Sequence, residues 1–309
     1  MTAKKTMRAA AATRAGDVDV LAVLTLPVPV PGPDQVRVRV RAAGLQPFDL
    51  AVRAGWVPPH AQVSFPQVLG NEFAGTVDAV GPGVAQFTPG QEVLGFNVLN
   101  SQAEYVVVGE DQLAHKPAAM PWEVAGGFTA GTQTAYLALT QLNVDHGDTV
   151  LVHAAAGAVG TAAVQLARLR GAKVLGTASP ANQDYLRDLG ATPVVYGEGL
   201  ADRLRALAPD GVDAVLDGAG GEALDLSLDL VASPARIVTL VEHARAADLG
   251  VQLVRGTRSA TRLGELAALY AEGRLEFPVR RAYHLTDIRA AHREIATGHG
   301  AGKVVLTFD

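Results

Sequence analysis

The segment His146-Gly-Asp-Thr-Val-Leu-Val-His-Ala-Ala-Ala-Gly-Ala-Val-Gly-Thr-Ala-Ala-Val-Gln-Leu-Ala167 decides the fold of this chain. Residues 150–152 form a short apolar, β-branched run after the turn signal Gly147-Asp148, and apolar residues then recur at helical spacing over residues 162–169. These patterns predict a buried strand, a tight turn and a helix, in that order.

The turn between this strand and this helix carries small residues. The first amides of a helix have no partner within the helix and lie at the positive end of its dipole, so such a turn binds phosphate. Ala155, Gly157 and Gly160 have the spacing of the G-x-G-x-x-G dinucleotide fingerprint, with alanine in the first place. The residues expected to contact a pyrophosphate are Ala155, Ala156, Gly157, Ala158, Val159 and Gly160. The alternative is a strand-to-helix turn that is merely tight.

Length and composition restrict the class of protein. A chain of 309 residues with 49% hydrophobic residues is long enough for two domains and a sizeable core. The net charge of −5 and the lack of a face-forming basic cluster argue against a nucleic-acid partner. With no cysteine, the chain has no disulfide, no thiolate metal site and no cysteine nucleophile.

Targeting signals are not visible in the sequence. The N-terminal residues 1–6 (MTAKKT) are followed by no apolar core segment, so we interpret them as a short tail and not as a signal peptide. No uninterrupted apolar run reaches the length of about 18 residues that a membrane span needs. We therefore expect no membrane association and, by default, a cytoplasmic protein.

The pattern of strands changes along the chain near residues 117–121. Before this point, short alternating runs such as residues 36–41 are separated by proline and glycine turns, which predicts a barrel-like or sandwich-like β unit. Beyond it, apolar runs alternate with helical segments, which predicts βαβ units and a parallel sheet. The expected strands of this sheet are residues 150–152, 173–177, 193–196, 214–217, 236–241 and 251–254. A last strand at residues 304–308 needs a host, and we expect the β-rich unit to provide it.

Several segments match a known family. They are residues 42–49 (AAGLQPFD), 70–77 (GNEFAGTV), 81–84 (GPGV), 89–95 (PGQEVLG), 154–160 (AAAGAVG), 162–167 (AAVQLA) and 302–306 (GKVVL). Through them the chain resembles, over nearly its whole length, the zinc-independent quinone oxidoreductases of the medium-chain dehydrogenase/reductase superfamily.

The resemblance implies an α/β protein of two domains with an active site in the cleft between them. A GroES-like β-rich catalytic domain is expected at residues 1–121, completed by residues 273–309, and a Rossmann domain with a doubly wound parallel sheet at residues 122–272. In zinc-dependent relatives a Cys stands where Gln46 stands and a His where Asn71 stands. Neither carboxamide is a good zinc ligand, and the histidines show no close ligand spacing, so we expect no metal.

The cofactor is predicted from the end of the second Rossmann strand. An NAD enzyme places an acid about 20 residues beyond the glycine turn to bind the ribose hydroxyls. Residues 176–182 (GTASPAN) contain no acid, so a 2′-phosphate can be accommodated and Ser179 can donate a hydrogen bond to it. By the resemblance, Tyr196 reaches the adenosine phosphate, and related enzymes carry a Lys or Arg near residues 181–183 that this chain lacks. We predict NADPH; the alternatives are a plain turn residue at Ser179 and a solvent-exposed tyrosine at Tyr196.

Without a metal to polarise a simple aldehyde, the better hydride acceptors are quinones and α,β-unsaturated carbonyls, because conjugation spreads the incoming charge. The resemblance implies that Thr134 lies under the nicotinamide, with Gln46 and Asp49 near its amide and the substrate opening. The backbone at Leu240 and Val241 is expected to border the carboxamide. Gln46 either donates a hydrogen bond to a developing oxyanion or only positions the substrate. For Asp49 we prefer a structural role, tying its loop to a backbone N–H, over general acid catalysis.

A second class of function uses the same turn. A non-catalytic NADPH-binding protein, such as a redox sensor or a crystallin-like relative, would bind the dinucleotide and tolerate a degraded substrate pocket. A short-chain dehydrogenase is excluded because no tyrosine is followed four positions later by a lysine. Residues 251–254 could be an edge strand that pairs across a two-fold axis, so we expect a homodimer.

Overall fold

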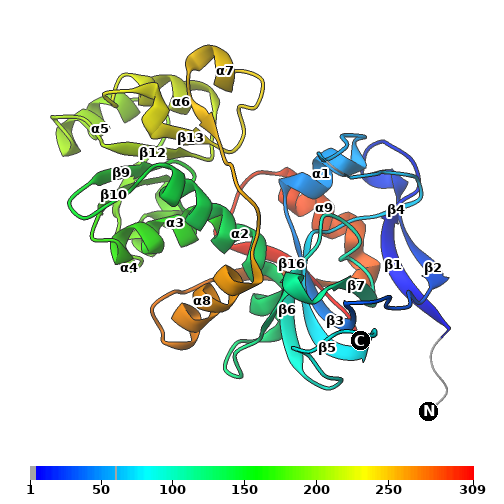
Figure 1. Cartoon of the computed structure of the whole chain (residues 1–309). Coiled ribbons are helices and arrows are strands. Elements are labelled where there is room, and N and C mark those ends of the chain that lie inside the picture. Colours follow the sequence, from blue (N-terminus) through cyan, green and yellow to red (C-terminus); the bar gives the residue numbers. More distant parts are fainter. Residues whose placement is uncertain (1–4, 60) are drawn as a thin grey trace. The chain divides into compact units, whose positions relative to one another are not determined.

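The structure, a computed structural model, describes residues 5–59 and 61–309, which form two compact units (Figure 1). Unit 1 contains the described residues up to Ala130, together with Arg258–His299 and Lys303–Asp309. Unit 2 contains Gly131–Thr257 and Gly300–Gly302. Residues 1–4 of the predicted N-terminal tail and His60 lie outside the described residues. Within that part of the chain, no helix is both long enough and apolar enough to cross a membrane.

Unit 2 is built on a parallel sheet with the strand order β11-β10-β9-β12-β13-β14. In chain order this is 3-2-1-4-5-6, the order of a Rossmann fold, and the order reverses between β9 and β12. Ligands of such sheets bind outside the carboxyl ends of the strands at this reversal. The elements are β9 (Thr149–Val152), α3 (Ala158–Leu169), β10 (Lys173–Ala178), α4 (Gln183–Asp188), β11 (Thr192–Val195), α5 (Leu200–Leu207), β12 (Ala214–Asp217), α6 (Gly221–Leu228), β13 (Ile237–Thr239), α7 (Ala246–Leu249) and β14 (Gln252–Leu253).

The apolar runs predicted the strands of unit 2 to within two residues at each end. The reason is burial, because strands of a parallel sheet are covered on both faces and are therefore apolar throughout. Leu151, Val215 and Ile237, on three neighbouring strands, are fully buried in one core with Leu204 of α5 and Leu224 of α6.

Unit 1 is β-rich, as the alternating runs predicted, and its strands form two sheets. One has the order β15-β16-β3-β5-β6-β8 with β7 paired to β3, and the other has the order β2-β1-β4. The elements are β1 (Thr6–Ala12), β2 (Leu21–Pro27), β3 (Gln35–Leu45), α1 (Pro47–Arg53), β4 (Gln67–Val68), β5 (Glu72–Val80), β6 (Glu92–Phe96), β7 (Tyr105–Gly109), β8 (Leu113–His115), α8 (Ala260–Ala271), β15 (Val279–His284), α9 (Ile288–Ala296) and β16 (Lys303–Thr307).

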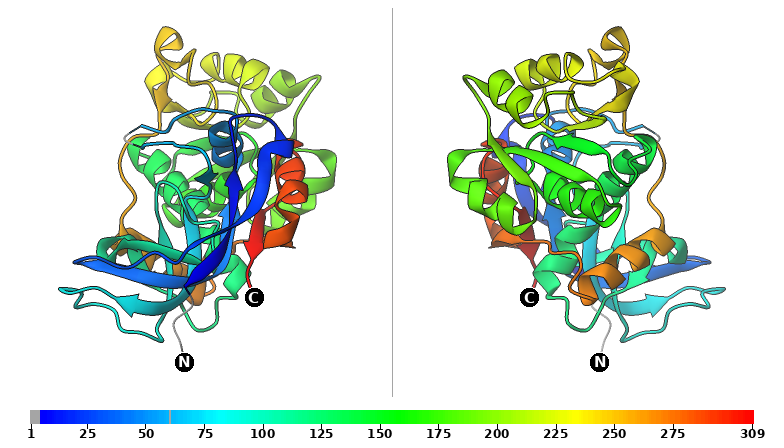
Figure 2. Two further views of the ribbon diagram at one scale, coloured as in Figure 1. Left: turned by 90° about the vertical axis from the view of Figure 1, so that its right-hand side faces the viewer. Right: turned by 90° about the vertical axis from the view of Figure 1, so that its left-hand side faces the viewer.

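The last strand joins the β-rich unit. β16 pairs antiparallel with β3, with Val305 opposite Gly44 and Leu306 opposite Ala43. The preceding helix, α9, lies beside the N-terminal strands in both views of Figure 2, and the Arg289 guanidinium donates to the carbonyl oxygen of Leu21 at 2.8 Å. Residues far apart in the sequence therefore close one core, and unit 1 depends on the C-terminal segment.

The boundaries between the units differ from those expected at residues 121 and 272. Helix α2 (Trp122–Gln141) has its first nine residues in unit 1, and the whole of α8 belongs to that unit as well. Aromatic packing explains the assignment, because Phe128 of α2 contacts Tyr270 and Phe277 with ring centroids 6.0 and 5.4 Å apart. These contacts join α2 and α8 within the β-rich unit.

Replacing two helical glycines of unit 1 by alanine should change the thermal stability in opposite directions. A Cβ at Gly126 in α2 would lie 2.5 Å from the Cβ of Ala42 on β3, whereas a Cβ at Gly264 in α8 meets nothing within 4 Å. Gly126→Ala should therefore lower the melting temperature, because overpacking costs about 1–3 kcal/mol. Gly264→Ala should leave it unchanged or raise it, because alanine is the better helix former by about 1 kcal/mol. Thermal unfolding of both variants checks the pair, and equal melting temperatures would contradict the packing.

Candidate active site

The turn after β9 has the geometry of an anion-binding site. Ala154 has φ +55°, a left-handed conformation that is rare for alanine and that reverses the chain at the carboxyl end of β9. The Ala155 amide then donates to the Thr177 carbonyl oxygen at 2.9 Å, which fixes the turn to β10. The Thr161 amide donates to the Gly157 carbonyl oxygen at 2.8 Å as α3 begins. Residues before Thr161 contribute the first-turn amides of the helix, which a phosphate can accept from.

The two glycines of the turn have different physical roles. A Cβ at Gly160 would lie 2.6 Å from the Cα of Ala155, so glycine is needed there for α3 to pack on the turn. A Cβ at Gly157 would meet only the Ala154 carbonyl oxygen, at 3.3 Å. A side chain at Gly157 would therefore need a shift of only a few tenths of an ångström, much less than one at Gly160. A bare backbone at this position suits the close approach of a pyrophosphate, so the turn fits a dinucleotide.

The other predicted cofactor residues follow neighbouring strands at the same edge of the sheet. Ser179 follows β10 and Tyr196 follows β11, and these strands pair so that Ala178 lies opposite Val195. Tyr196 is 49% exposed, so its ring is accessible to a ligand. Leu240 and Val241 follow β13, and the Leu240 amide donates to the Asp217 carbonyl oxygen at 2.8 Å. Unit 2 thus brings all the predicted dinucleotide contacts to the carboxyl ends of its strands.

His153, the residue before the turn, belongs to the core of unit 2. Its ring nitrogens lie 3.0 Å from the hydroxyls of Thr177 and Ser227, and only 2% of the residue is exposed. Burial lowers the pKa of His153 to about 4, although the nearby Asp217 acts in the opposite direction. The residue is therefore a neutral, hydrogen-bonded support under the turn.

Unit 1 contains a polar cluster, which we define as Gln46, Asn71, Glu72, Arg258 and Lys303. Asn71, Glu72 and Lys303 are buried, and Gln46 and Arg258 are half-buried. The Lys303 ammonium lies 2.5 Å from Oε1 of Glu72 and 2.8 Å from Oε1 of Gln46. The Gln46 amide nitrogen donates to Oδ1 of Asn71, and the Arg258 guanidinium donates to the Asn71 carbonyl oxygen at 2.7 Å. Glu72 is fully buried, so the ammonium beside it compensates a charge that would otherwise be costly to bury.

Asp49 lies next to this cluster in the first turn of α1. Its two carboxylate oxygens accept from the backbone amides of Gln46 and Gly70, each at 2.9 Å. Burial raises the pKa of Asp49 to about 7, although these amides and Lys303 act in the opposite direction. The contacts tie two loops together, as a structural role for this residue requires.

The residues at the expected metal-ligand positions bind each other. A side-chain hydrogen bond joins Gln46 to Asn71, and the Lys303 ammonium donates to the carbonyl oxygen of Gln46. Among the described residues, no group of three or more His, Asp or Glu side chains could hold a metal ion. The donor set is therefore unsuited to a divalent cation.

The predicted catalytic residues fall in different units. Gln46 and Asp49 lie together in unit 1, at the start of α1, and Thr134 lies half-buried in the part of α2 that belongs to unit 2. Sequence reasoning missed the roles of Lys303, Glu72 and Arg258. Lys303 and Glu72 lie within matching segments, at 302–306 and 70–77, so buried charges inside those segments were the signal that could have found them. Nothing in the sequence singles out Arg258.

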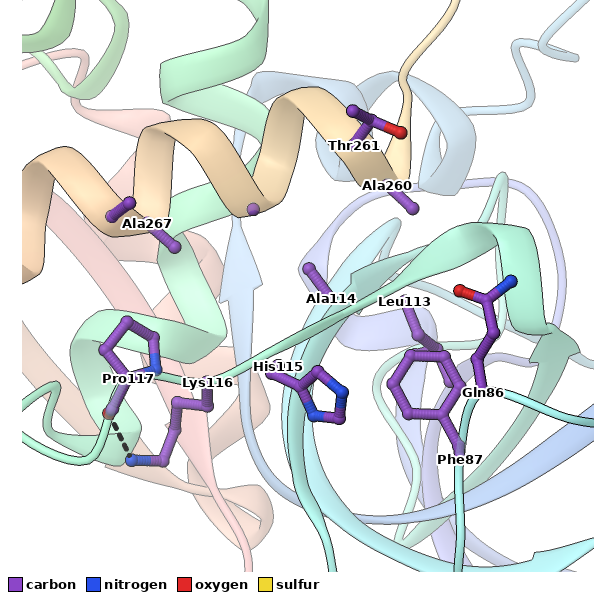
Figure 3. Close-up of a pocket in the computed structure, with 12 residues that line it drawn as sticks. Gln86, Phe87, Leu113, Ala114, His115, Lys116, Pro117, Ala260, Thr261 and Ala267 are labelled. Carbon is purple, nitrogen blue, oxygen red and sulfur yellow. Dashed lines mark hydrogen bonds between the residues drawn. The ribbon is translucent and has the colours of Figure 1, made fainter.

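A separate pocket of 440 Å³ lies in unit 1 between β8 and α8 (Figure 3). Its walls are mostly apolar, with Phe87 facing the His115 ring at a centroid distance of 5.0 Å. The Lys116 ammonium at its edge donates to the carbonyl oxygen of Pro117 at 3.0 Å. None of the predicted site residues lines this pocket.

Comparison with known proteins finds relatives of both units of the chain. Residues 32–146 match the family of alcohol dehydrogenase GroES-like domains, and residues 189–306 match the family of zinc-binding dehydrogenases. A quinone oxidoreductase of Pseudomonas aeruginosa is 32% identical over 291 residues, which cover 86% of this chain and 88% of that protein. The structure of a quinone oxidoreductase from Coxiella burnetii superposes with a TM-score of 0.89 and 30% identity, covering 99% of this chain and all of that one.

Much longer proteins also match. Polyketide synthase GfsB of Streptomyces halstedii is 36% identical over 259 residues, which cover 78% of this chain. The chain spans only 5% to 13% of the length of this and the other polyketide synthases at the head of the comparison.

A GroES-like unit and a Rossmann unit in one chain define the two-unit architecture of the alcohol dehydrogenase families that match. The chain belongs to the quinone oxidoreductases of the medium-chain dehydrogenase/reductase superfamily.

Substituting Gly157 tests the turn. Gly157→Asp brings its Cβ to 3.3 Å from the Ala154 carbonyl oxygen, which must shift by a few tenths of an ångström, and it places a carboxylate among the first-turn amides of α3. We expect its affinity for NADPH and NADH to fall by about 100-fold or more, because like charges then meet in the site. Fluorescence titration measures this, with Gly157→Ala as the control that keeps the site neutral. An aspartate variant with wild-type affinity would show that the dinucleotide binds elsewhere.

The pKa of His153 predicts loss of stability in acid. The ordinary pKa of histidine is about 6.5, so the unfolded chain binds a proton below that pH while the folded chain does not until about pH 4. The stability that the neutral ring contributes is therefore lost as pH falls from 6.5 towards 4, by about 2 kcal/mol at pH 5. Unfolding free energies of wild type and His153→Asn at pH 7.5 and pH 5 should show the smaller drop in the variant. Equal drops would mean that His153 does not titrate in this range.

Proposed function

We propose that this chain is a zinc-independent, NADPH-dependent oxidoreductase that transfers a hydride to a quinone or an α,β-unsaturated carbonyl. The turn after β9 carries the proposal, because its first-turn amides and the absence of a side chain at Gly157 suit a pyrophosphate. The family and the strand order of unit 2 support the same site. A homodimer and a cytoplasmic location stay predictions.

The preference for NADPH is supported by the charges at the adenosine end of the site. Ser179 follows β10, and residues 176–182 around it contain no Asp or Glu that would repel a 2′-phosphate. The predicted loop lacks a Lys or Arg, but Arg203 of α5 lies close to the neighbouring strand end. Its guanidinium donates to the carbonyl oxygens of Val195 and Glu198, both at 2.8 Å, and Val195 is paired with Ala178. Arg203 thus adds positive charge at the end of β11, the strand next to β10.

Zinc independence is supported by the positive charge of Lys303, which lies beside Gln46, at a position where zinc-dependent relatives carry a zinc ligand. A divalent cation bound by Gln46 and Asn71 would displace their mutual hydrogen bond and lie close to the Lys303 ammonium. Repulsion between two positive charges a few ångströms apart in a partly buried site is worth several kcal/mol, so the lysine disfavours a metal.

The acceptor class follows from what the residues of unit 1 can supply. A bound reduced nicotinamide supplies the hydride, and the protein must stabilise the negative charge that develops on the acceptor oxygen. Gln46 offers an amide N–H for that oxygen. Phe48 and the half-exposed Trp56 contact each other edge to face, with centroids 5.6 Å apart, and provide aromatic surface on and after α1. A planar conjugated acceptor suits both features.

Turnover tests the function directly. Purified protein should oxidise NADPH in the presence of members of a panel of quinones and enones, and prior treatment with a metal chelator should leave the rate unchanged. NADPH binding without turnover on any acceptor would instead support the non-catalytic sensor. A rate that is lost on chelation and restored by zinc would contradict the metal-free mechanism.

The cofactor preference is tested at Ser179. Ser179→Asp places a carboxylate where it can accept from ribose hydroxyls and repel a 2′-phosphate. We expect kcat/KM for NADPH to fall and the ratio of NADPH to NADH efficiency to shift towards NADH by at least about tenfold, which corresponds to ~1.4 kcal/mol. Steady-state kinetics with both cofactors measures the ratio, and Ser179→Ala is the neutral control. An unchanged ratio in the aspartate variant would place the 2′-phosphate away from Ser179.

A further inference from the structure

Lys303 is held in a space that the fold makes for it. Only 3% of the residue is exposed, and its side chain crosses two glycines on different elements. A Cβ at Gly44 of β3 would lie 2.8 Å from Cε of Lys303, and a Cβ at Gly127 of α2 would lie 2.7 Å from its Cγ. Any larger residue at either position would displace the lysine. The route of this side chain through unit 1 is therefore fixed by backbone on both sides.

The position of the Lys303 ammonium group is also fixed by its neighbours. Its ammonium lies 2.5 Å from Oε1 of Glu72, which is fully buried. The other oxygen of Glu72 accepts from the Ala130 amide at 2.6 Å, so this carboxylate cannot turn away. The ion pair is rigid because both partners are held by groups outside the pair.

This arrangement determines which way the Gln46 carboxamide points. An ammonium is a donor only, so the atom of Gln46 that lies 2.8 Å from Lys303 must be the carbonyl oxygen. The amide nitrogen then faces away from Lys303 and donates one hydrogen to Oδ1 of Asn71. The second N–H of Gln46 has no partner assigned by these contacts, and Gln46 is half-buried at the start of α1.

We propose that Lys303 is a positioning residue that orients Gln46 and polarises its amide, so that the second N–H of Gln46 donates to the oxygen of the hydride acceptor. This inference rests on the proposed function and names a residue for it. A cation on the carbonyl side of an amide strengthens the amide as a donor, because hydrogen bonds in a chain polarise one another. Negative charge that develops on the acceptor oxygen is then stabilised by a donor fixed before the reaction begins.

The inference predicts that Lys303 acts only through Gln46. Lys303→Met is combined with Glu72→Gln, because the lysine change alone would leave a buried carboxylate without a counter-charge. This double variant should lower kcat by about 10- to 100-fold while the dissociation constant for NADPH stays unchanged. Gln46→Met should lower kcat to a similar degree. Adding the two changes at Lys303 and Glu72 to Gln46→Met should then alter kcat by less than about twofold.

A matched control comes from a second buried lysine of unit 1. The Lys116 ammonium lies 3.0 Å from a carboxylate oxygen of Glu92, and the lysine is 9% exposed. Lys116→Met with Glu92→Gln removes an ion pair outside the polar cluster, in which the Glu92 side chain is 47% exposed whereas Glu72 is fully buried. It should affect stability and leave kcat unchanged. Equal effects of the Lys303 changes in the wild-type and Gln46→Met backgrounds would overturn the proposal.

A second readout does not need turnover. The side-chain amide of Gln46 gives nitrogen–proton NMR signals that can be assigned by their loss in Gln46→Met. Removing Lys303 and Glu72 should shift these signals, because the carbonyl oxygen loses its charged partner. If the wild-type protein fails to oxidise NADPH with every acceptor of the panel, the proposed function is wrong. The NMR spectrum still decides whether Lys303 orients Gln46. Gln46 signals that stay in place without Lys303 would overturn the orientation that we infer.

Discussion

The contact between Gly160 and the turn beneath it is the constraint on which unit 2 depends. Because a side chain at Gly160 would collide with Ala155, only glycine lets α3 begin so close to the end of β9. That closeness brings the first amides of the helix to the edge of the sheet where the strand order reverses. The positive end of the helix and the strand ends carrying Ser179, Tyr196 and Leu240 then share one edge, where a dinucleotide can lie along them.

Unit 1 holds several polar groups in fixed orientations inside its β-rich core. Glu72 and Lys303 are buried as a pair, and two glycines leave room for the lysine. Beside this pair, the Lys303 ammonium donates to the Gln46 carbonyl oxygen, and the Gln46 amide nitrogen donates to Oδ1 of Asn71. A position that could hold a cation in zinc-dependent relatives thus lies beside an ammonium of the protein itself.

Much of the fold could be predicted because the signals were local. The parallel strands are short apolar runs, and β3 alternates buried valines with more exposed arginines, so their periods identify them. Helix α2 was not predicted, since Gly126, Gly127 and Gly131 interrupt its helical pattern and its hydrophobic faces are not separated. The compact units divide within α2 and not before it, because the start of α2 joins unit 1 through Phe128, a contact with residues far along the chain.

The site was predictable where a motif and its flanking elements coincide, as at Gly157 and Gly160. It was not predictable where charge compensation joins distant residues. Lys303 and Glu72 are 231 positions apart, and their strands, β16 and β5, lie in one sheet because both pair with β3. A sequence shows that both residues exist but not that one neutralises the other.

A crystal structure of the protein with NADPH would show whether the turn after β9 binds the dinucleotide. We expect pyrophosphate oxygens about 3 Å from the backbone amides of residues 158–160 in the first turn of α3, with the 2′-phosphate beside Ser179. A dinucleotide bound away from this turn, or contacted there only by side chains, would contradict this expectation.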